Sequence, residues 1–205
     1  MKKFILLLGV LALGFTSCSK KSENLKVIPK DAIAVVSFDL QTLYKKADVE
    51  ELQKLKSFQK IKEELNNDNN KMGKIFSEIL NNPKASGIDF KKNAYLFAFN
   101  NKKYGGDSRQ PHIGITAVLS DDNKFKDLLN RVSEATYMEL DIKKDGALNI
   151  VHLNNESYLS WDDNKMLFIA GEDYRSMEGE SVLKKLYNQD KSEQITNIKG
   201  FSDFL

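Results

Sequence analysis

Apolar and polar positions follow one another in blocks that predict the strands and helices of an α+β protein. Runs rich in β-branched and aromatic residues predict strands within 32–40, at 95–99 and 112–119, and near 148–153, 156–161 and 166–170. Apolar residues at three- and four-residue steps predict helices over 39–65, 71–80, about 120–137 and 176–188. The predicted order is therefore β-α-α-β-β-α-β-β-β-α.

The short connections between these strands determine how the strands can pair. Strands joined by a few residues cannot be parallel neighbours. Asn154 with Asn155, and residues 162–164, supply the turns between the last three strands. We expect a mostly antiparallel sheet with helices packed on one face, in a single domain over 27–205. The apolar residues within 201–205 either dock on the core or show that the chain is a shortened form.

The N-terminus has the pattern of an exported protein. Lys2 and Lys3 precede the largely apolar run 4–15, which is typical of a secretory signal and too short to span a membrane. Thr16 and Ser17 then precede Cys18, the single cysteine, and this stretch resembles a bacterial lipobox. The resemblance implies a signal peptide over 1–17 and a diacylglyceryl group on Cys18. The alternative is an ordinary secreted protein that is cleaved elsewhere.

Charge and composition limit what the mature domain can do. Loss of Lys2 and Lys3 with the signal would bring the formal net charge from +2 to zero, which argues against a nucleic-acid partner. The lipid, rather than basic side chains, would then hold the protein at the membrane. Residues 18–26 are polar and aperiodic, and we expect them to form a flexible tether.

Three stretches resemble one protein family. VIPKDAIAVVSFDLQTLYKKADV, GIDFKKNAYLFAF and HIGITAVLSDDNKFKDLL resemble successive blocks of Bacteroidetes lipoproteins in the domain-of-unknown-function 4836 family. The resemblance covers residues 27 to about 170. It implies an envelope lipoprotein without an assigned activity, and it supplies no functional residues. Members of the family are usually much longer, so the resemblance implies that a C-terminal region is missing after Leu205.

Polar motifs in the chain have structural explanations. His112 and His152 are too few to make a zinc site, because no cysteine is left to join them. Asp-Asp-Asn-Lys occurs at 121–124 and 162–165, but neither copy continues as a calcium-binding loop. The first copy is better explained as a helix cap and the second as a hairpin turn. We therefore expect no catalytic, cofactor-binding or metal-ligating residues.

Aromatic residues in the strands have two interpretations. Tyr158 and Trp161 are a candidate ligand surface, since rings on one sheet face can bind a carbohydrate or a peptide. The alternative is that they belong to the core. Tyr95, Phe97 and Phe99 alternate along one strand, and we expect them to be core residues.

These observations favour a lipid-anchored cell-envelope protein that binds an envelope protein or a glycan through a sheet face or edge, without being an enzyme. In related bacteria an acidic run after the cysteine favours the cell surface. Ser19, Lys20 and Lys21 stand there instead, so the resemblance implies an outer-membrane protein that faces the periplasm. A glycan- or envelope-directed hydrolase with unidentified carboxylates is one alternative. An assembly subunit that lacks its C-terminal region is another.

Overall fold

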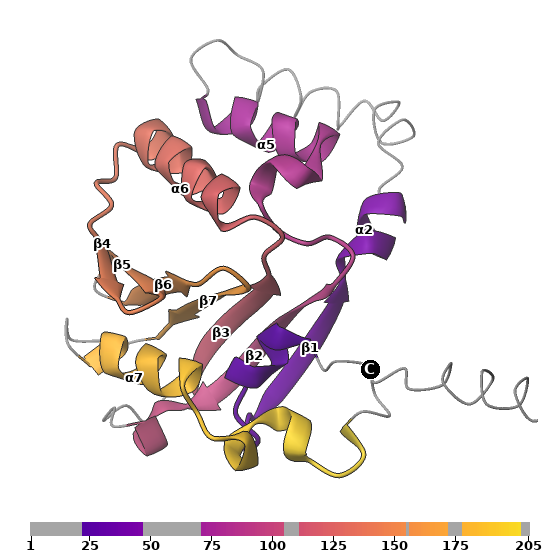
Figure 1. Ribbon diagram of the computed structural model, residues 1–205, viewed down its shortest axis with the longest axis vertical. Coiled ribbons are helices and arrows are strands. Elements are labelled where there is room, and N and C mark those ends of the chain that lie inside the picture. Colours follow the sequence, from indigo (N-terminus) through magenta and orange to yellow (C-terminus); the bar gives the residue numbers. More distant parts are fainter. Residues whose placement is uncertain (1–21, 47–70, 105–110, 155, 172–177, 202–205) are drawn as a thin grey trace, which may run out of the picture.

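A seven-stranded antiparallel sheet forms the centre of the computed structural model, which describes residues 22–46, 71–104, 111–154, 156–171 and 178–201 (Figure 1). Its strands are β1 (Ala34–Asp39), β2 (Asn93–Asn100), β3 (Pro111–Val118), β4 (Ile142–Asp145), β5 (Leu148–Asn154), β6 (Ser157–Trp161) and β7 (Lys165–Ala170). They are arranged in the order β1-β2-β3-β7-β6-β5-β4, which makes β1 and β4 the two edges.

The helices connect and cover these strands. They are α2 (Leu40–Lys46), α5 (Lys71–Asn81), α6 (Asp122–Thr136) and α7 (Glu178–Tyr187), with the short 3₁₀ helices η1 (Glu23–Val27), η2 (Pro83–Ser86), η3 (Asn101–Tyr104), η4 (Lys191–Glu193) and η5 (Ile195–Asn197). The predicted α+β class and the antiparallel sheet are confirmed. Of the helix predicted over 39–65, only α2 falls among the described residues.

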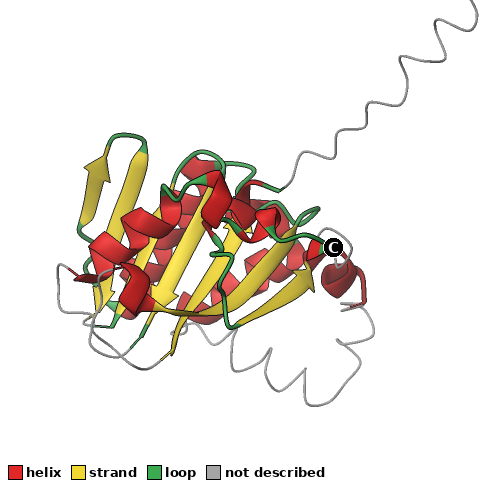
Figure 2. Cartoon of the chain, turned by 90° about the horizontal axis from the view of Figure 1, so that it is seen from below, coloured by secondary structure: helices red, strands yellow, loops and turns green. Residues whose placement is uncertain are grey.

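The helices lie on both faces of the sheet rather than on one (Figure 2). Helix α7 packs against one face through Val182, Leu183 and Leu186. Helix α6 packs against the opposite face through Phe125 and Leu129. The expectation of helices on a single face was wrong because both sides of β6 and β7 carry apolar residues, and each side needs a cover.

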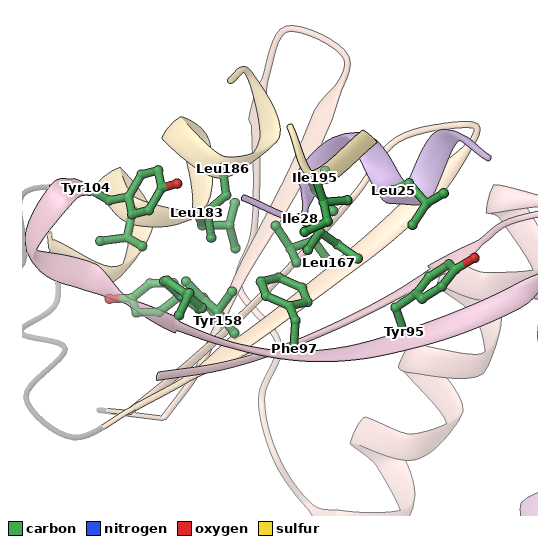
Figure 3. Close-up of a cluster of buried hydrophobic side chains, with 14 of the residues drawn as sticks. Leu25, Ile28, Tyr95, Phe97, Tyr104, Tyr158, Leu167, Leu183, Leu186 and Ile195 are labelled. Atoms are coloured by element: carbon green, nitrogen blue, oxygen red, sulfur yellow. The ribbon is translucent and has the colours of Figure 1, made fainter. Parts of the chain in front are cut away.

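The face beneath α7 contains the larger core. Tyr95, Phe97 and Phe99 of β2 point into it and are buried, which confirms the prediction for these alternating aromatics. Residues from both ends of the described chain cover them: in Figure 3, Ile28 and Ile195 lie above Phe97, and Leu25 lies above Tyr95. This core therefore joins segments that are far apart in the sequence.

The predicted tether over 18–26 is shorter than expected. From Glu23 onward the chain forms η1, in which Leu25 is 1% exposed and Asn24 is fully buried. The Asn24 amide donates a 2.8 Å hydrogen bond to the carbonyl of Asn93. The polar sequence concealed this packing because a single leucine and one hydrogen-bonded amide hold the segment. Residues 18–21 lie outside the described part.

A smaller core lies beneath α6, on the other face. Trp161 is buried there and meets the Phe125 ring edge to face, with 5.7 Å between the ring centroids. The chain approaches α6 through Gly87, whose φ of +75° favours glycine. A Cβ atom on Gly87 would lie 2.3 Å from the carbonyl oxygen of Asp121, so this close approach requires glycine.

Strand β4 was not predicted. Its residues Ile142, Lys143, Lys144 and Asp145 include only one apolar side chain, so they show no alternating pattern. The segment pairs with β5 through its backbone and forms an edge of the sheet. Its single apolar residue, Ile142, packs against the core beneath α6, and its other side chains are charged.

Candidate functional site

Helix α6 covers only part of one face of the sheet. The rest of that face, on β1, β2 and β3, is apolar and exposed. Val36 of β1, Leu96 of β2 and Ile115 of β3 occupy one row across the three strands. Val36 is 47% exposed and Ile115 is 39% exposed, while Phe38 and Ile113 beside them are 38% and 45% exposed. We define Val36, Phe38, Leu96, Ile113 and Ile115 as the open face. Clustered apolar exposure of this kind marks an interaction site more often than scattered exposure does.

Strand β1 contributes Val36 and Phe38 to the open face and forms an edge of the sheet (Figure 1). It pairs with β2 on one side, and no strand in the described part of the chain pairs with its other side. Residues 34–38 contain no charged side chain. The opposite edge, β4, carries Lys143, Lys144 and Asp145, and such charges discourage the addition of another strand. The two edges therefore differ in the protection that their sequences give.

The end of β1 is fixed by a capping residue. Asp39 accepts a 2.9 Å hydrogen bond from the backbone N–H of Thr42 and a 2.6 Å bond from its hydroxyl. These bonds hold the pKa of Asp39 below its usual range. They also set the direction of α2, where Leu43 and Tyr44 are exposed. Apolar exposure thus continues from the open face onto α2, which contacts β1 and β2.

A second feature is a cleft of about 710 Å³ formed by η3, α7 and the segment after α7. Ion pairs run along its sides. Lys184 lies 2.7 Å from Glu180 and 2.8 Å from Asp145 of β4. The Glu193 carboxylate accepts hydrogen bonds from Lys103 and, at 2.8 Å, from Lys30. Lys103 of η3 and Lys184 of α7 are thereby held in place by acidic partners.

The ionisation of the cleft follows from these contacts. Hydrogen bonds from Lys103 and Lys30 lower the pKa of Glu193 to about 2. Burial raises the pKa of the Tyr104 hydroxyl to about 12, so this group keeps its proton at neutral pH. The described carboxylates with a displaced pKa are Asp39, Asp162 and Glu193, and each is lowered. A general acid for hydrolysis needs the opposite shift.

The two candidate ligand-surface residues do not share a surface. Tyr158 and Trp161 are each 1% exposed, and they point to opposite faces of β6. Tyr158 belongs to the core beneath α7 and stacks on His152 with 4.5 Å between the ring centroids. Trp161 belongs to the core beneath α6. Their burial agrees with the alternative interpretation as core residues.

The histidines are also separated. His112 is buried on β3, His152 is exposed on β5, and β7 and β6 lie between these strands. Within the described ranges, no group of three or more residues could hold a metal ion. Cys18, the predicted lipidation site, lies outside the described residues.

The repeated tetrapeptide has the two structural roles that the sequence predicts. Asp121 caps α6 by accepting a 3.0 Å hydrogen bond from the N–H of Lys124. Asp162 closes the turn between β6 and β7 by accepting from the N–H groups of Asn164 and Lys165. Burial alone would raise the pKa of Asp162, but these N–H groups and the Lys165 charge lower it.

The fold and its exposed features define an α+β domain with one unprotected sheet edge, an apolar face beside that edge and a polar cleft. The chain belongs to the family described as a domain of unknown function (DUF4836), whose model matches residues 24–205. This agrees with the family that the sequence resembles. No curated protein and no solved structure matches the chain. None of the described helices has the length and apolar character needed to cross a membrane.

Sequence reasoning did not identify the open face. The alternation at residues 34, 36 and 38, and at 113 and 115, predicts one apolar side for each strand. Alternation cannot show whether a helix covers that side, because the cover comes from elsewhere in the chain. The cleft left no sequence signal, since its lining comes from separate segments of ordinary polar composition.

Proposed function

We propose that this chain is a Bacteroidetes lipoprotein, held at the outer membrane by Cys18 and facing the periplasm, that binds an envelope protein without catalysing a reaction. The observation that carries the binding role is the unprotected β1 edge beside the open face. An extended segment of a partner would add a strand to β1 and place its apolar side chains against the open face. Strand addition of this kind obtains affinity from backbone hydrogen bonds and specificity from alternate side chains.

The N-terminal sequence supports the anchoring part of the proposal. A lipobox-like stretch ends at Cys18, and η1 is already packed into the core from Glu23. The five residues 18–22 can span at most about 18 Å when fully extended. A lipid on Cys18 would therefore keep the domain, and with it the β1 edge, close to the bilayer. Partners embedded in or attached to the same membrane would be within reach.

Photo-crosslinking tests the binding role. A photoreactive amino acid would replace Val36 in the full chain, and irradiation would be carried out in cells. A matched chain would carry the same group at Tyr137, which is 88% exposed and lies after α6. We expect a covalent adduct with a second, different envelope protein from position 36 and none from position 137.

The adducts also separate the alternatives. An adduct made of two copies of this chain would show that β1 mediates self-association instead of binding a different envelope protein. Equal crosslinking from positions 36 and 137 would contradict the β1 edge as a specific site. In a further chain the photoreactive amino acid would replace Ser37, and Val36 would be replaced by lysine. This Val36→Lys substitution should abolish a genuine adduct because a charged edge resists strand addition.

Intact mass tests the anchor. Protein extracted from membranes should have the mass of residues 18–205 plus acyl chains. The Cys18→Ala chain should lack that addition and should not partition with the membrane. An unmodified mature chain would contradict lipidation, and it would leave the crosslinking result as an independent test of the β1 edge.

A further inference from the structure

We propose that the cleft between η3 and α7 binds a neutral, hydroxyl-rich ligand of the size of a mono- or disaccharide. This inference is independent of the proposed partner at β1. Three properties of the cleft support it: its balanced charge, its unused hydrogen-bonding groups and its fixed frame. Together they match a ligand that carries many hydroxyl groups and no net charge.

The charges around the cleft cancel. Three lysines and three acidic residues line it: Lys103, Lys184, Lys185, Glu180, Asp190 and Glu193. Lys103 and Lys184 already have carboxylate partners. A phosphate or a carboxylate ligand would have to compete with those carboxylates, and an amine would have to compete with the lysines. A neutral ligand does not disturb these pairs and avoids the cost of burying an unpaired charge.

Several lining groups have hydrogen-bonding capacity to spare. Ser181 and Asn188 are exposed, and their side chains have no hydrogen-bond partner among the described residues. Tyr104 and Gln189 also line the cleft, and the Tyr104 hydroxyl and the Oε1 atom of Gln189 are buried without a hydrogen-bond partner in the described part of the chain. Buried polar atoms are nearly always paired, so each of these atoms requires an explanation.

A sugar hydroxyl can pair with an unpaired donor and with an unpaired acceptor, because it donates one hydrogen bond and accepts others. Gln189 Oε1 can only accept, so it needs a donor from the ligand. The Tyr104 hydroxyl keeps its proton at neutral pH and can donate. Both atoms are buried in the present arrangement, so a ligand reaches them only when the side chains that cover them move.

The frame of the cleft is rigid. The Gln189 amide nitrogen donates a 2.8 Å hydrogen bond to the carbonyl of Lys26, which ties the cleft to η1. Lys185 donates a 2.8 Å bond to the carbonyl of Tyr104, which ties α7 to η3. The Tyr104 ring lies beside Leu183 and Leu186 of α7 (Figure 3). The volume of about 710 Å³ lies within the range of small-molecule sites.

Saturation-transfer NMR tests this site with three neutral disaccharides: maltose, cellobiose and lactose. The full chain would be held in a detergent without a sugar headgroup. We expect transfer from protein to at least one disaccharide, and at least a fivefold weaker signal with Asn188→Trp, which fills the mouth of the cleft. Asn123→Trp, an exposed substitution on α6, should leave the signal unchanged.

A second variant tests the buried hydroxyl. Tyr104→Phe keeps the ring and removes an unpaired polar atom, so we expect an unchanged or slightly higher Tm. Affinity for the disaccharide should nevertheless fall about tenfold. Absence of transfer to all three disaccharides overturns the proposal. Transfer that survives both Asn188→Trp and Tyr104→Phe, or stronger transfer to glucuronate or glucosamine than to the neutral sugars, also overturns it.

Discussion

At the scale of single residues, the two copies of Asp-Asp-Asn-Lys show how burial changes the role of the same side chains. In the first copy, Lys124 and Asp121 are 54% and 37% exposed at the side chain and 3.8 Å apart. In the second copy, Lys165 and Asp162 are 10% and 15% exposed and 3.0 Å apart. Lys165 also lies 4.3 Å from the centroid of the Tyr187 ring. Water screens the first pair and is largely excluded from the second.

This difference predicts unequal effects of the same substitution. Lys165→Met should lower the free energy of unfolding by about 2 kcal/mol, because it leaves the buried Asp162 carboxylate without a counter-charge. Lys124→Met should cost less than about 1 kcal/mol, as expected for an exposed pair. Urea unfolding of both chains measures the difference. Equal costs would contradict the importance of burial at Asp162.

Glu193 predicts a pH dependence. Its folded-state pKa of about 2 lies below the ordinary value of 4.5, so its stabilising contribution is complete above pH 4.5 and is lost as the pH falls toward 2. Carboxyl NMR should find this group still ionised at pH 3. In Lys103→Gln the pKa should rise towards 4.5, because the main hydrogen-bond donor is gone. A normal pKa in the unmodified chain would show that the ion pairs do not persist in solution.

At the scale of elements, the pattern of apolar residues predicted the members of the sheet better than their arrangement. β1, β2, β3, β5, β6 and β7 were predicted because each presents alternating or continuous apolar residues. β4 and η1 were missed because one isoleucine in β4, and one leucine and one valine in η1, are too few to make a pattern. The division of helices between two faces, the open face and the cleft depend on contacts between distant segments, which periodicity does not record.

The packing of η1 gives a test at this scale. Leu25→Ala should cost about 2–5 kcal/mol, since it removes a side chain that is 1% exposed in the larger core. Ile33→Ala, at a side chain that is 62% exposed, should change stability by less than about 1 kcal/mol. Thermal or urea unfolding measures both values. A small effect at Leu25 would restore the interpretation of this segment as a tether.

At the scale of the whole molecule, one face of the sheet is closed by segments from both ends of the described chain, and the other is closed by α6 over only part of its width. η1 and η5 meet on the larger core, where Ile195 donates a 2.8 Å backbone hydrogen bond to the carbonyl of Ile28. The open face lies on the opposite side, at the β1 end of the sheet. The molecule therefore combines a sealed side with an accessible one.

The sealed side predicts a requirement for residues after α7. A chain shortened to residue 190 lacks Ile195 and the segment that pairs with η1, and we expect it to unfold without a cooperative transition. A chain shortened to residue 201 keeps every described contact and should unfold cooperatively. Calorimetry of the two chains measures the difference. A sharp transition in the shorter chain would show that the core closes without η5.

The joining of both ends in one core also determines when the protein can fold. η1 precedes the other described elements along the chain and its partners in α7 and η5 follow them, so a growing or translocating chain cannot complete this core until η5 has emerged. β1 likewise waits more than fifty residues for its neighbour β2. A chain exported through a narrow channel must stay unfolded until it has crossed. This topology delays folding in the way that the proposed export would require.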